Sequence, residues 1–542
     1  MPKARSTTSS SDLRTTPATL DVAKITHLQG LREQAQKQWK IRNLQPFFPA
    51  MEQLFKLDHV RMPFHYGLKT KQTVQTISSP EKVFSSSGQE TPVHRKTTMV
   101  LSPFRWMRGD FGSSGLPVDQ ETSHLIRNKL QTPHNAAYVG GLIATALSET
   151  GCLHFPVVYG TYVGLAEEFQ LNISDDYEDL CDRPWFVQNI GHTFELRLKE
   201  QVKAGASTPL CITNESVELD VQELEPVEGV QTSPAEGADM IPFEPSEEEE
   251  DDEEEDSSHA STDYIFEIRS CSSDGSSPIG QEEEEEEPYA HAVFRDVQVQ
   301  TTVMEKCTDT LYHLFKANPE TEKRMAWLGQ VVMALTFAQR NFGFVHNDLH
   351  VNNIMYVPTT LPHLLYNVAG VYYRIPTYGY IMKIIDFDRA TYSIKLPGMR
   401  ESRFFMSDQF QIDEEAGGQY NTEPFYNNKY PEIKPNASFD LVRLATSLFW
   451  DCFPLGPFEE SYQTDALFQL LLSWMTLPDG SSILFRNLAE KDAHDRFHGF
   501  HLYKKIARAC KDTAVPRKQL EKFSHFTFVP VVLAERCLFI EP

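Results

Sequence analysis

Hydrophobic and polar positions alternate in several short segments of this chain. KQTVQTISS, EKVFSSSG and PVHRKTTMVL, between residues 71 and 101, are rich in Val, Thr and Ile and are separated by Pro, Ser and Gly. This pattern is typical of strands, because successive side chains in a strand point to opposite faces of a sheet. HFPVVYGTYVG and, after Phe294, VQVQTTVME predict further strands. Residues 70–102 therefore predict three strands of a sheet that later segments can extend.

Helical periodicity appears in four other places. It runs from Leu20 to Leu57, with breaks at Pro46 and Pro49, and again through HNAAYVGGLIATALSETG, where Gly151 is a plausible C-cap. Residues 325–342 place apolar side chains on one helical face, and SFDLVRLATSLFWDCF does the same after a possible Ser cap. Between these two helices, NNIMYV, VYYRIP and YIMKIIDF read as strands. The second half of the chain is thus predicted to be mainly helical with one strand-rich stretch.

The composition changes sharply between residues 207 and 290. The chain has 542 residues, enough for more than one folding unit, and a net charge of -26. Residues 215–287 alone hold 28 acidic residues and one basic residue, so the rest of the chain is close to neutral. Such dense like charge predicts disorder. The insert is either a solvated loop, a phosphorylated segment at Ser246 or Ser257, or a site for a basic protein partner.

Other compositional features exclude several classes of protein. A near-neutral body does not suit direct nucleic-acid binding, which needs clustered positive charge. The eight cysteines are scattered and form no CxxC pair, so zinc and disulfides are not expected. No secretory signal or run of roughly 18 apolar residues is apparent, so we expect no membrane segment and no secretion.

Three polar residues in two motifs suggest phosphoryl transfer. FVHNDLHVNNIMYV places Asp348 and Asn353 in one loop after a core helix, and MKIIDFDRA places Asp386 at the end of an apolar strand. Carboxylate and amide oxygens are the hard ligands that Mg²⁺ prefers. A further carboxylate can orient an attacking hydroxyl. This combination favours a phosphoryl-transfer site that holds magnesium against the phosphates of a nucleotide.

These motifs resemble those of the protein-kinase superfamily. HNDLHVNNIM is similar to its catalytic loop, HxDxxxxN, and IIDFD is similar to its magnesium-binding motif, usually DFG. The resemblance implies that Asp348 is the catalytic base, that Asn353 and Asp386 hold magnesium, and that His346 is structural. His350 lies where serine/threonine kinases usually have lysine, and can contact the γ-phosphate. Asp388 replaces the usual glycine.

Further segments extend the resemblance toward the nucleotide. VQVQTTVMEKCTDTLYHLF is similar to the strand and hinge of a kinase, which implies that main-chain groups near Glu305 and Cys307 receive adenine and that Asp309 reaches the ribose. VHRK resembles the VAIK motif, so Lys96 is the candidate that grips the α- and β-phosphates. The following helix offers only Glu149 as a partner for this lysine, and the Gly-rich loop is missing apart from Gly88.

The helix SFDLVRLATSLF resembles the one that supports the catalytic loop, with Asp440 bracing the loop backbone. The resemblance as a whole is nearest to the serine/threonine kinase-like proteins of nucleocytoplasmic large DNA viruses. It implies an α+β, two-lobed protein-kinase-like fold, with a small antiparallel β-rich N-lobe and a larger, mainly helical C-lobe. The expected divisions are a disordered tail (1–18), a helical extension (19–58), the N-lobe (59–206), the disordered acidic insert (207–290), the last N-lobe strand (291–304) and the C-lobe (305–542).

The implied activity is ATP- and magnesium-dependent transfer of phosphate to Ser/Thr hydroxyls of a protein substrate. Two alternatives remain open on the sequence. IDFD and DLHxxN also suit small-molecule kinases of the aminoglycoside or choline type, and the missing Gly-rich loop suits a pseudokinase scaffold. A viral kinase of this kind is expected in the host cytoplasm or virus factory, or in the virion.

Overall fold

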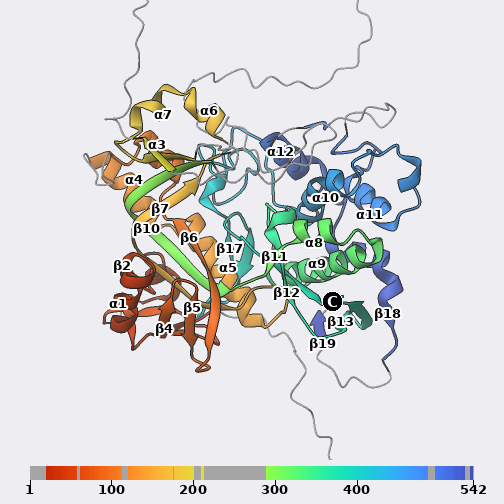
Figure 1. The fold of residues 1–542 in the computed structure, drawn as a ribbon, viewed down its shortest axis with the longest axis horizontal. Helices are drawn as coiled ribbons and strands as arrows, with labels where there is room; N and C mark the ends of the chain where they lie inside the picture. The colour runs from red at the N-terminus through yellow and green to blue at the C-terminus, as the bar shows by residue number, and fades with distance from the viewer. Residues whose placement is uncertain are drawn as a thin grey trace, which may run out of the picture.

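The computed structural model describes residues 20–57, 61–112, 120–174, 176–199, 209–212, 289–485, 495–497, 499–530 and 537–540. These residues form a mixed α+β structure in which a curled antiparallel sheet, several smaller sheets and helices pack together. The strands of the largest sheet gather on one side of the molecule, and most of the long helices lie on the other (Figure 1). No helix within the described ranges is long and apolar enough to cross a membrane.

The largest sheet in the described residues has eight strands, and β10 lies at its centre. β10 pairs with β7 along one edge and with β6 and β8 along the other, antiparallel throughout. The predicted strands of residues 70–102 are confirmed as β4, β5 and β6. The strands are β2 (Ile41–Gln45), β4 (Val74–Ser79), β5 (Lys82–Ser85), β6 (Glu90–Met99), β7 (Val158–Asn172), β8 (Glu195–Lys199), β9 (Pro209–Ile212) and β10 (Ala290–Glu305).

The N-terminal segment contains less helix than its periodicity predicts. Its elements are β1 (Val22–Lys24), α1 (Leu28–Gln38), β2 and α2 (Met51–Phe55), followed by β3 (Tyr66–Leu68). β2 pairs with β7 at the edge of the large sheet, and β1 pairs with β3. The expected helical extension over 19–58 is therefore corrected, because pairing with β7 buries Ile41 and Leu44 as strand residues and overrides the local helical pattern.

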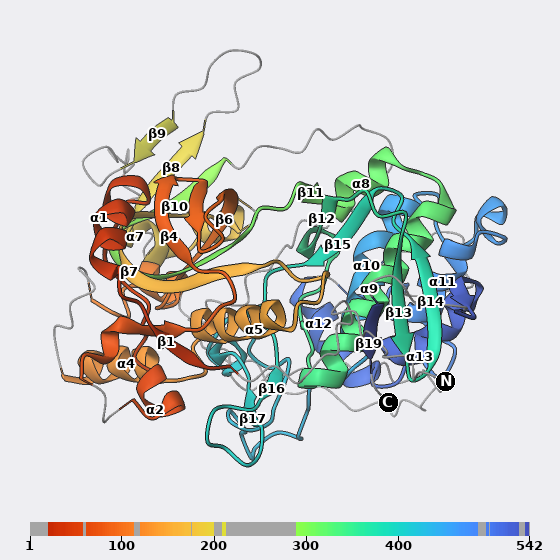
Figure 2. The same cartoon turned by 90° about the horizontal axis from the view of Figure 1, so that it is seen from below.

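Helix α5 (Ala136–Thr150) matches its prediction closely. The side chain of Asn135 accepts a hydrogen bond from the Ala137 N–H, which caps the first turn. Gly151 ends the helix with φ +75°, as its predicted C-cap role requires. Figure 2 shows α5 between the large sheet and the helix-rich side. The neighbouring helices are α3 (Pro103–Arg108), α4 (Gln120–Gln131), α6 (Tyr177–Cys181) and α7 (Pro184–Asn189).

The helix-rich side is built on α9 and α10, both predicted from periodicity. Ser438 occupies the N-cap position of α10, but its hydroxyl donates to the Lys511 carbonyl and does not cap the helix. The helices are α8 (Leu311–Ala317), α9 (Thr321–Phe342), α10 (Phe439–Cys452), α11 (Ala466–Met475), α12 (Phe500–Ala509) and α13 (Pro516–Gln519).

Short strands connect these helices in three small sheets. The stretch between α9 and α10 that was expected to be rich in strands contains β12 to β17. β11, β12 and β15 form one sheet, β18, β14, β13 and β19 a second, and β16 and β17 a third. Their bounds are β11 (Asp309–Thr310), β12 (Ile354–Pro358), β13 (His363–Val368), β14 (Val371–Pro376), β15 (Tyr380–Ile384), β16 (Tyr392–Ile394), β17 (Arg403–Phe405), β18 (Thr527–Phe528) and β19 (Cys537–Ile540).

Two hydrophobic clusters hold the described residues together. One packs against the large sheet and includes Trp106, Phe186 and Phe294. The other is larger and joins α5 to α9 and α10, so helix α5 shares its core with the helix-rich side. The interface between the two sides is therefore anchored by buried apolar area at α5.

Most of the expected disordered insert, 207–290, lies outside the described residues, as does the tail over 1–18. The described part of the insert corrects its boundary. Pro209–Ile212 form β9, which pairs antiparallel with β8. The sheet therefore continues a few residues further than the change in composition indicates.

Candidate functional site

The loop after α9 is fixed by hydrogen bonds to buried groups. The carboxylate of Asp440, on α10, accepts from the peptide N–H groups of His346 and Asn347 at 2.9 and 3.0 Å. Asp440 therefore braces this loop, as the sequence predicted. Asn347 has φ +65°, a conformation that asparagine tolerates better than most residues. The buried ring of His346 bonds through Nε2 to the Ile385 carbonyl at 2.7 Å, which ties the loop to the segment after β15.

Asp348 points into a cluster of hydrogen-bond donors and positive charge. The hydroxyl of Tyr503, on α12, donates to its Oδ1 at 2.6 Å, and Arg389 lies 3.7 Å from its Oδ2. Burial alone would raise the pKa of Asp348, but Arg389, His350, the Tyr503 hydrogen bond and Arg443 together hold it below its usual value. Asp348 is therefore ionised at neutral pH and able to accept a hydrogen bond from a hydroxyl.

Asn353 and His350 complete the loop. The Asn353 amide nitrogen donates to the Asp348 carbonyl at 2.8 Å and lies 3.0 Å from His350 Nε2. These contacts orient the amide so that its oxygen faces away from both partners. Burial lowers the pKa of His350, with Asp348 opposing the effect and Arg443 reinforcing it. His350 is therefore neutral at pH 7, and a neutral imidazole contacts a phosphate by hydrogen bonding alone.

Lys96, Asp386 and Asp388 meet across the gap between β6 and the segment after β15. Lys96 Nζ lies 2.5 Å from Asp386 Oδ1 and 2.8 Å from Asp388 Oδ2. Thr98, two residues along β6, donates to Asp388 Oδ2 at 3.2 Å. Burial raises the pKa of Asp386, but Lys96 outweighs it and the net pKa is low, whereas burial keeps the pKa of Asp388 above its usual value. One lysine thus forms ion pairs with two nearby carboxylates.

A small cavity, partly open to solvent, lies beside this cluster. Residues of four segments line it. Strands β6 and β10 contribute side chains, α5 contributes a face that includes two glycines, and the segment after β15 contributes two aspartates and a phenylalanine. The lining residues are Lys96, Thr98, Ala137, Gly140, Gly141, Ala144, Gln300, Thr302, Met304, Asp386, Phe387 and Asp388. The charged side chains therefore lie together at one part of the cavity, and small, apolar and neutral polar side chains line the rest.

The predicted adenine-binding segment follows β10, which lines the cavity through Met304. The Glu305 N–H donates to the Val157 carbonyl at 2.8 Å, and its carboxylate pairs with buried Lys383 at 2.8 Å. Cys307 is buried, which raises the pKa of its thiol to about 11. Asp309 accepts from the Thr310 N–H and pairs with His313, both at 2.7 Å. The Glu305 N–H and the side chains of Glu305 and Asp309 thus have partners within the protein.

The donor set suits magnesium bound jointly by protein and phosphate. Within the described residues, no group of three or more His, Cys, Asp and Glu side chains is arranged to hold a metal ion by itself. Mg²⁺ in nucleotide sites commonly takes one or two carboxylates and fills its remaining positions with phosphate oxygens and water. Asp386, Asn353 and the nearby Asp388 supply only oxygen ligands, so their chemistry fits this ion.

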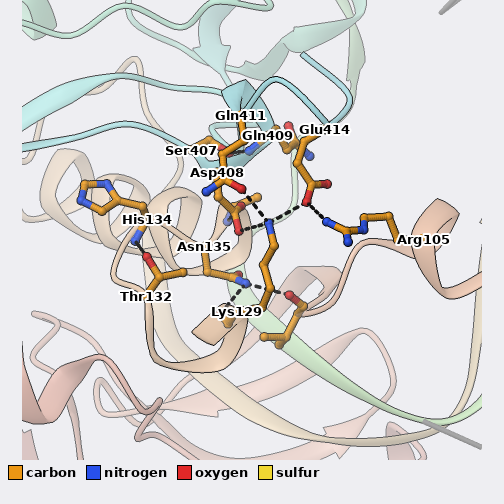
Figure 3. A network of polar contacts seen from close by, with 12 residues as sticks. Arg105, Lys129, Thr132, His134, Asn135, Ser407, Asp408, Gln409, Gln411 and Glu414 are labelled. Atoms are coloured by element: carbon orange, nitrogen blue, oxygen red, sulfur yellow. Dashed lines mark hydrogen bonds and ion pairs between the residues drawn. The ribbon is translucent and has the colours of Figure 1, made fainter. Parts of the chain in front are cut away.

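A buried network of charges fixes the segment after β17 against α3 and α4 (Figure 3). Lys129 Nζ lies 3.0 Å from Asp408 and 2.6 Å from Glu414, and Arg105 lies 2.9 Å from Glu414. The next residue, Glu415, lies 3.7 Å from Arg389, the same arginine that approaches Asp348. The network therefore connects α3 and α4 to the surroundings of Asp348.

The structure thus assembles two groups of the predicted residues, Asp348 with His350 and Asn353, and Lys96 with Asp386. The Ile385 N–H donates to the Asn353 carbonyl at 3.0 Å and holds the two groups together. Tyr503 and Arg389 were not anticipated. Tyr503 is more than 150 residues from Asp348 and has no motif, whereas the basic residue after IIDFD was a visible signal for Arg389.

Comparison with known proteins gives short matches. No protein-family model matches the chain. A Caenorhabditis elegans protein, uncharacterized protein ZK177.2, is 36% identical over 63 residues, which are 12% of this chain and 21% of that protein. Uncharacterized protein 098R of Invertebrate iridescent virus 6 is 24% identical over 150 residues, which are 27% of this chain and 22% of that protein. The chain therefore spans about a fifth of the length of these curated relatives.

Proposed function

We propose that this chain is a two-lobed, protein-kinase-like phosphotransferase that uses ATP and Mg²⁺ to phosphorylate Ser/Thr hydroxyls of proteins. The observation that carries the proposal is the meeting of Lys96, from β6, with Asp386 beside a cavity, while the loop of Asp348 is bonded to the same segment. In this proposal the large sheet is the core of the N-lobe, α8 to α13 form the C-lobe, and residues 305–309 are the hinge.

The proposed roles follow from the chemistry of each side chain. Bound Mg-ATP would supply the phosphoryl group and the cation that neutralises its charge. Lys96 binds phosphate oxygens, and Asp386 and Asn353 bind the cation through oxygen. Asp348, ionised and oriented by Tyr503, would accept a hydrogen bond from the substrate hydroxyl, take its proton as the phosphoryl group is transferred, and so direct the hydroxyl oxygen toward the phosphate. Catalysis then depends on positioning and charge, with little covalent chemistry by the protein.

A radiolabel assay tests the proposal. The full chain is incubated with Mg²⁺ and ATP labelled at the γ-phosphate, with casein as one acceptor and a panel of amino alcohols as another. We expect label in casein, and a loss of about 10²–10⁴-fold in Asp348→Ala. Asp179→Ala, an exposed carboxylate on α6, is the matched control and should retain the wild-type rate.

Each other outcome selects a different conclusion. Transfer to amino alcohols alone would replace the protein substrate by a small molecule. Binding of ATP without transfer to any acceptor would indicate a scaffold. Label in casein that is equal in wild type and Asp348→Ala would refute the assigned role of Asp348.

The similarity to a viral protein is compatible with action in the host cytoplasm or virus factory, which stays a prediction.

A further inference from the structure

Lys96 has two carboxylate partners, and they differ in their surroundings. Asp386 Oδ1 is the nearer, at 2.5 Å, but 45% of the Asp386 side chain is exposed. Only 19% of the Asp388 side chain is exposed, and its Oδ2 lies 2.8 Å from Lys96. Thr98 donates to the same oxygen from the strand that carries Lys96. Asp388 is therefore held in position by two residues of β6.

The two carboxylates cannot serve the same purpose once a nucleotide and its cation are bound. An Asp386 oxygen that ligates a cation has less negative charge to offer Lys96. A lysine without another partner would either remain on Asp386, in competition with the cation, or move with the freedom of its long side chain. Asp388 prevents both, because it holds Lys96 whether or not Asp386 is engaged.

Helix α5 makes room for Asp388 and offers Lys96 no carboxylate of its own. A Cβ added at Gly140 would lie 2.2 Å from Asp388 Oδ1, so a side chain at this helix position would force the Asp388 carboxylate to shift. Glu149 is the sole acidic residue in the sequence of α5, and it accepts from the Lys71 N–H at 2.8 Å. The glycine and the aspartate therefore fit together as a pair.

We propose that Asp388 is the positioning residue for Lys96, and that it replaces the helix glutamate which the kinase resemblance leads one to expect. The inference rests on the proposed function and adds a consequence to it. Because the carboxylate comes from the segment that carries Asp386, Lys96 is aligned together with the cation ligand. No movement of α5 is needed to place a carboxylate beside it.

Binding measurements on the full chain separate this role from a merely structural one. Isothermal titration with ADP plus Mg²⁺ reports phosphate and cation contacts, and titration with adenosine reports the rest of the pocket. We expect Asp388→Asn to weaken ADP binding about tenfold, to raise the Mg²⁺ concentration that ADP binding requires, and to leave adenosine affinity unchanged. Glu149→Gln, which changes the acid of α5 away from Lys96, should leave all three quantities unchanged.

A relocated carboxylate provides the second test. Asp388→Gly should weaken ADP binding as Asp388→Asn does. Adding Gly140→Asp to that variant puts a carboxylate into the space that Asp388 vacates, so ADP affinity should recover. The melting temperature of the double variant without ligand should stay comparable to that of Asp388→Gly. The single Gly140→Asp variant is the control, because its new side chain is expected to clash with Asp388. Recovery in the double variant alone would therefore be specific to a carboxylate that takes the place of Asp388 beside Lys96.

The results distinguish the two proposals. If wild-type protein binds ADP and Asp388→Asn binds it equally well, the positioning role is wrong and the proposed function stands. Equal losses of ADP and adenosine affinity would also overturn the role, since they indicate a distorted pocket. If the wild type binds neither ADP nor ATP, the proposed function fails, and the role of Asp388 fails with it.

Discussion

Replacement of Lys129 by Met should destabilise the protein strongly, because it removes one cation from between two buried carboxylates. The exposed side-chain fractions of Lys129, Asp408 and Glu414 are 10%, 8% and 3%. Methionine has a similar length and no charge, so the change removes the ion pairs and leaves most of the packing. Asp408 would keep one hydrogen bond, from the Ala136 N–H at 3.0 Å, and Glu414 would keep Arg105.

The magnitude follows from these remaining contacts. Removal of one partner from a buried ion pair costs about 3–5 kcal/mol, since it leaves an uncompensated charge. The contacts that remain place this case near the lower end, at about 3 kcal/mol. With a shift of about 1 °C per kcal/mol for a protein of this size, the melting temperature should fall by roughly 3 °C. Lys316→Met on the exposed end of α8 is the control and should change stability by less than about 0.5 kcal/mol.

The loss of stability in Lys129→Met should depend on pH. Burial already raises the pKa of Asp408 in spite of Lys129, and loss of the lysine should raise it further. An acid whose pKa is higher in the folded state than in the unfolded chain binds protons on folding, so its contribution to stability falls as the pH rises through that window. The deficit of Lys129→Met should therefore be larger at pH 8 than at pH 5. Thermal melts at both pH values measure it. A deficit below about 1 kcal/mol, or one that does not change with pH, would refute the argument.

Two further substitutions probe the surroundings of Asp348. Tyr503→Phe removes the hydroxyl that donates to this carboxylate, and should cost about 1.5–3 kcal/mol at pH 7. Because the folded-state pKa of Asp348 is depressed, the difference should diminish as acid protonates it, which urea denaturation at several pH values would detect; a difference that persists at low pH contradicts the assignment. Asp440→Asn turns one acceptor for the His346 and Asn347 N–H groups into a donor. It should cost about 1–3 kcal/mol in the same assay, and unchanged stability would mean that Asp440 does not brace the loop.

Local patterns were sufficient for the elements that local forces dominate. The periodicity of α9 and α10, the C-cap of α5 and the strands from β4 to β6 were all predicted from the sequence, because each depends on neighbours within a few residues. The motifs HNDLHVNNIM and IIDFD also identified the two loops that the structure brings together. The chemistry of those residue types limits what they can bind, and this limit does not depend on the fold.

Tertiary contacts decided the rest. Residues 41–45 form a strand because β7 offers a free edge, a fact that no local pattern contains. Tyr503 reaches Asp348 across more than 150 residues, and Lys129 reaches Asp408 across 279. Asp388 lies beside Lys96 in space that Gly140, on a third segment, leaves open. Sequence fixes which groups are available, whereas burial and distance, which depend on packing between remote segments, determine which of them meet and with what charge.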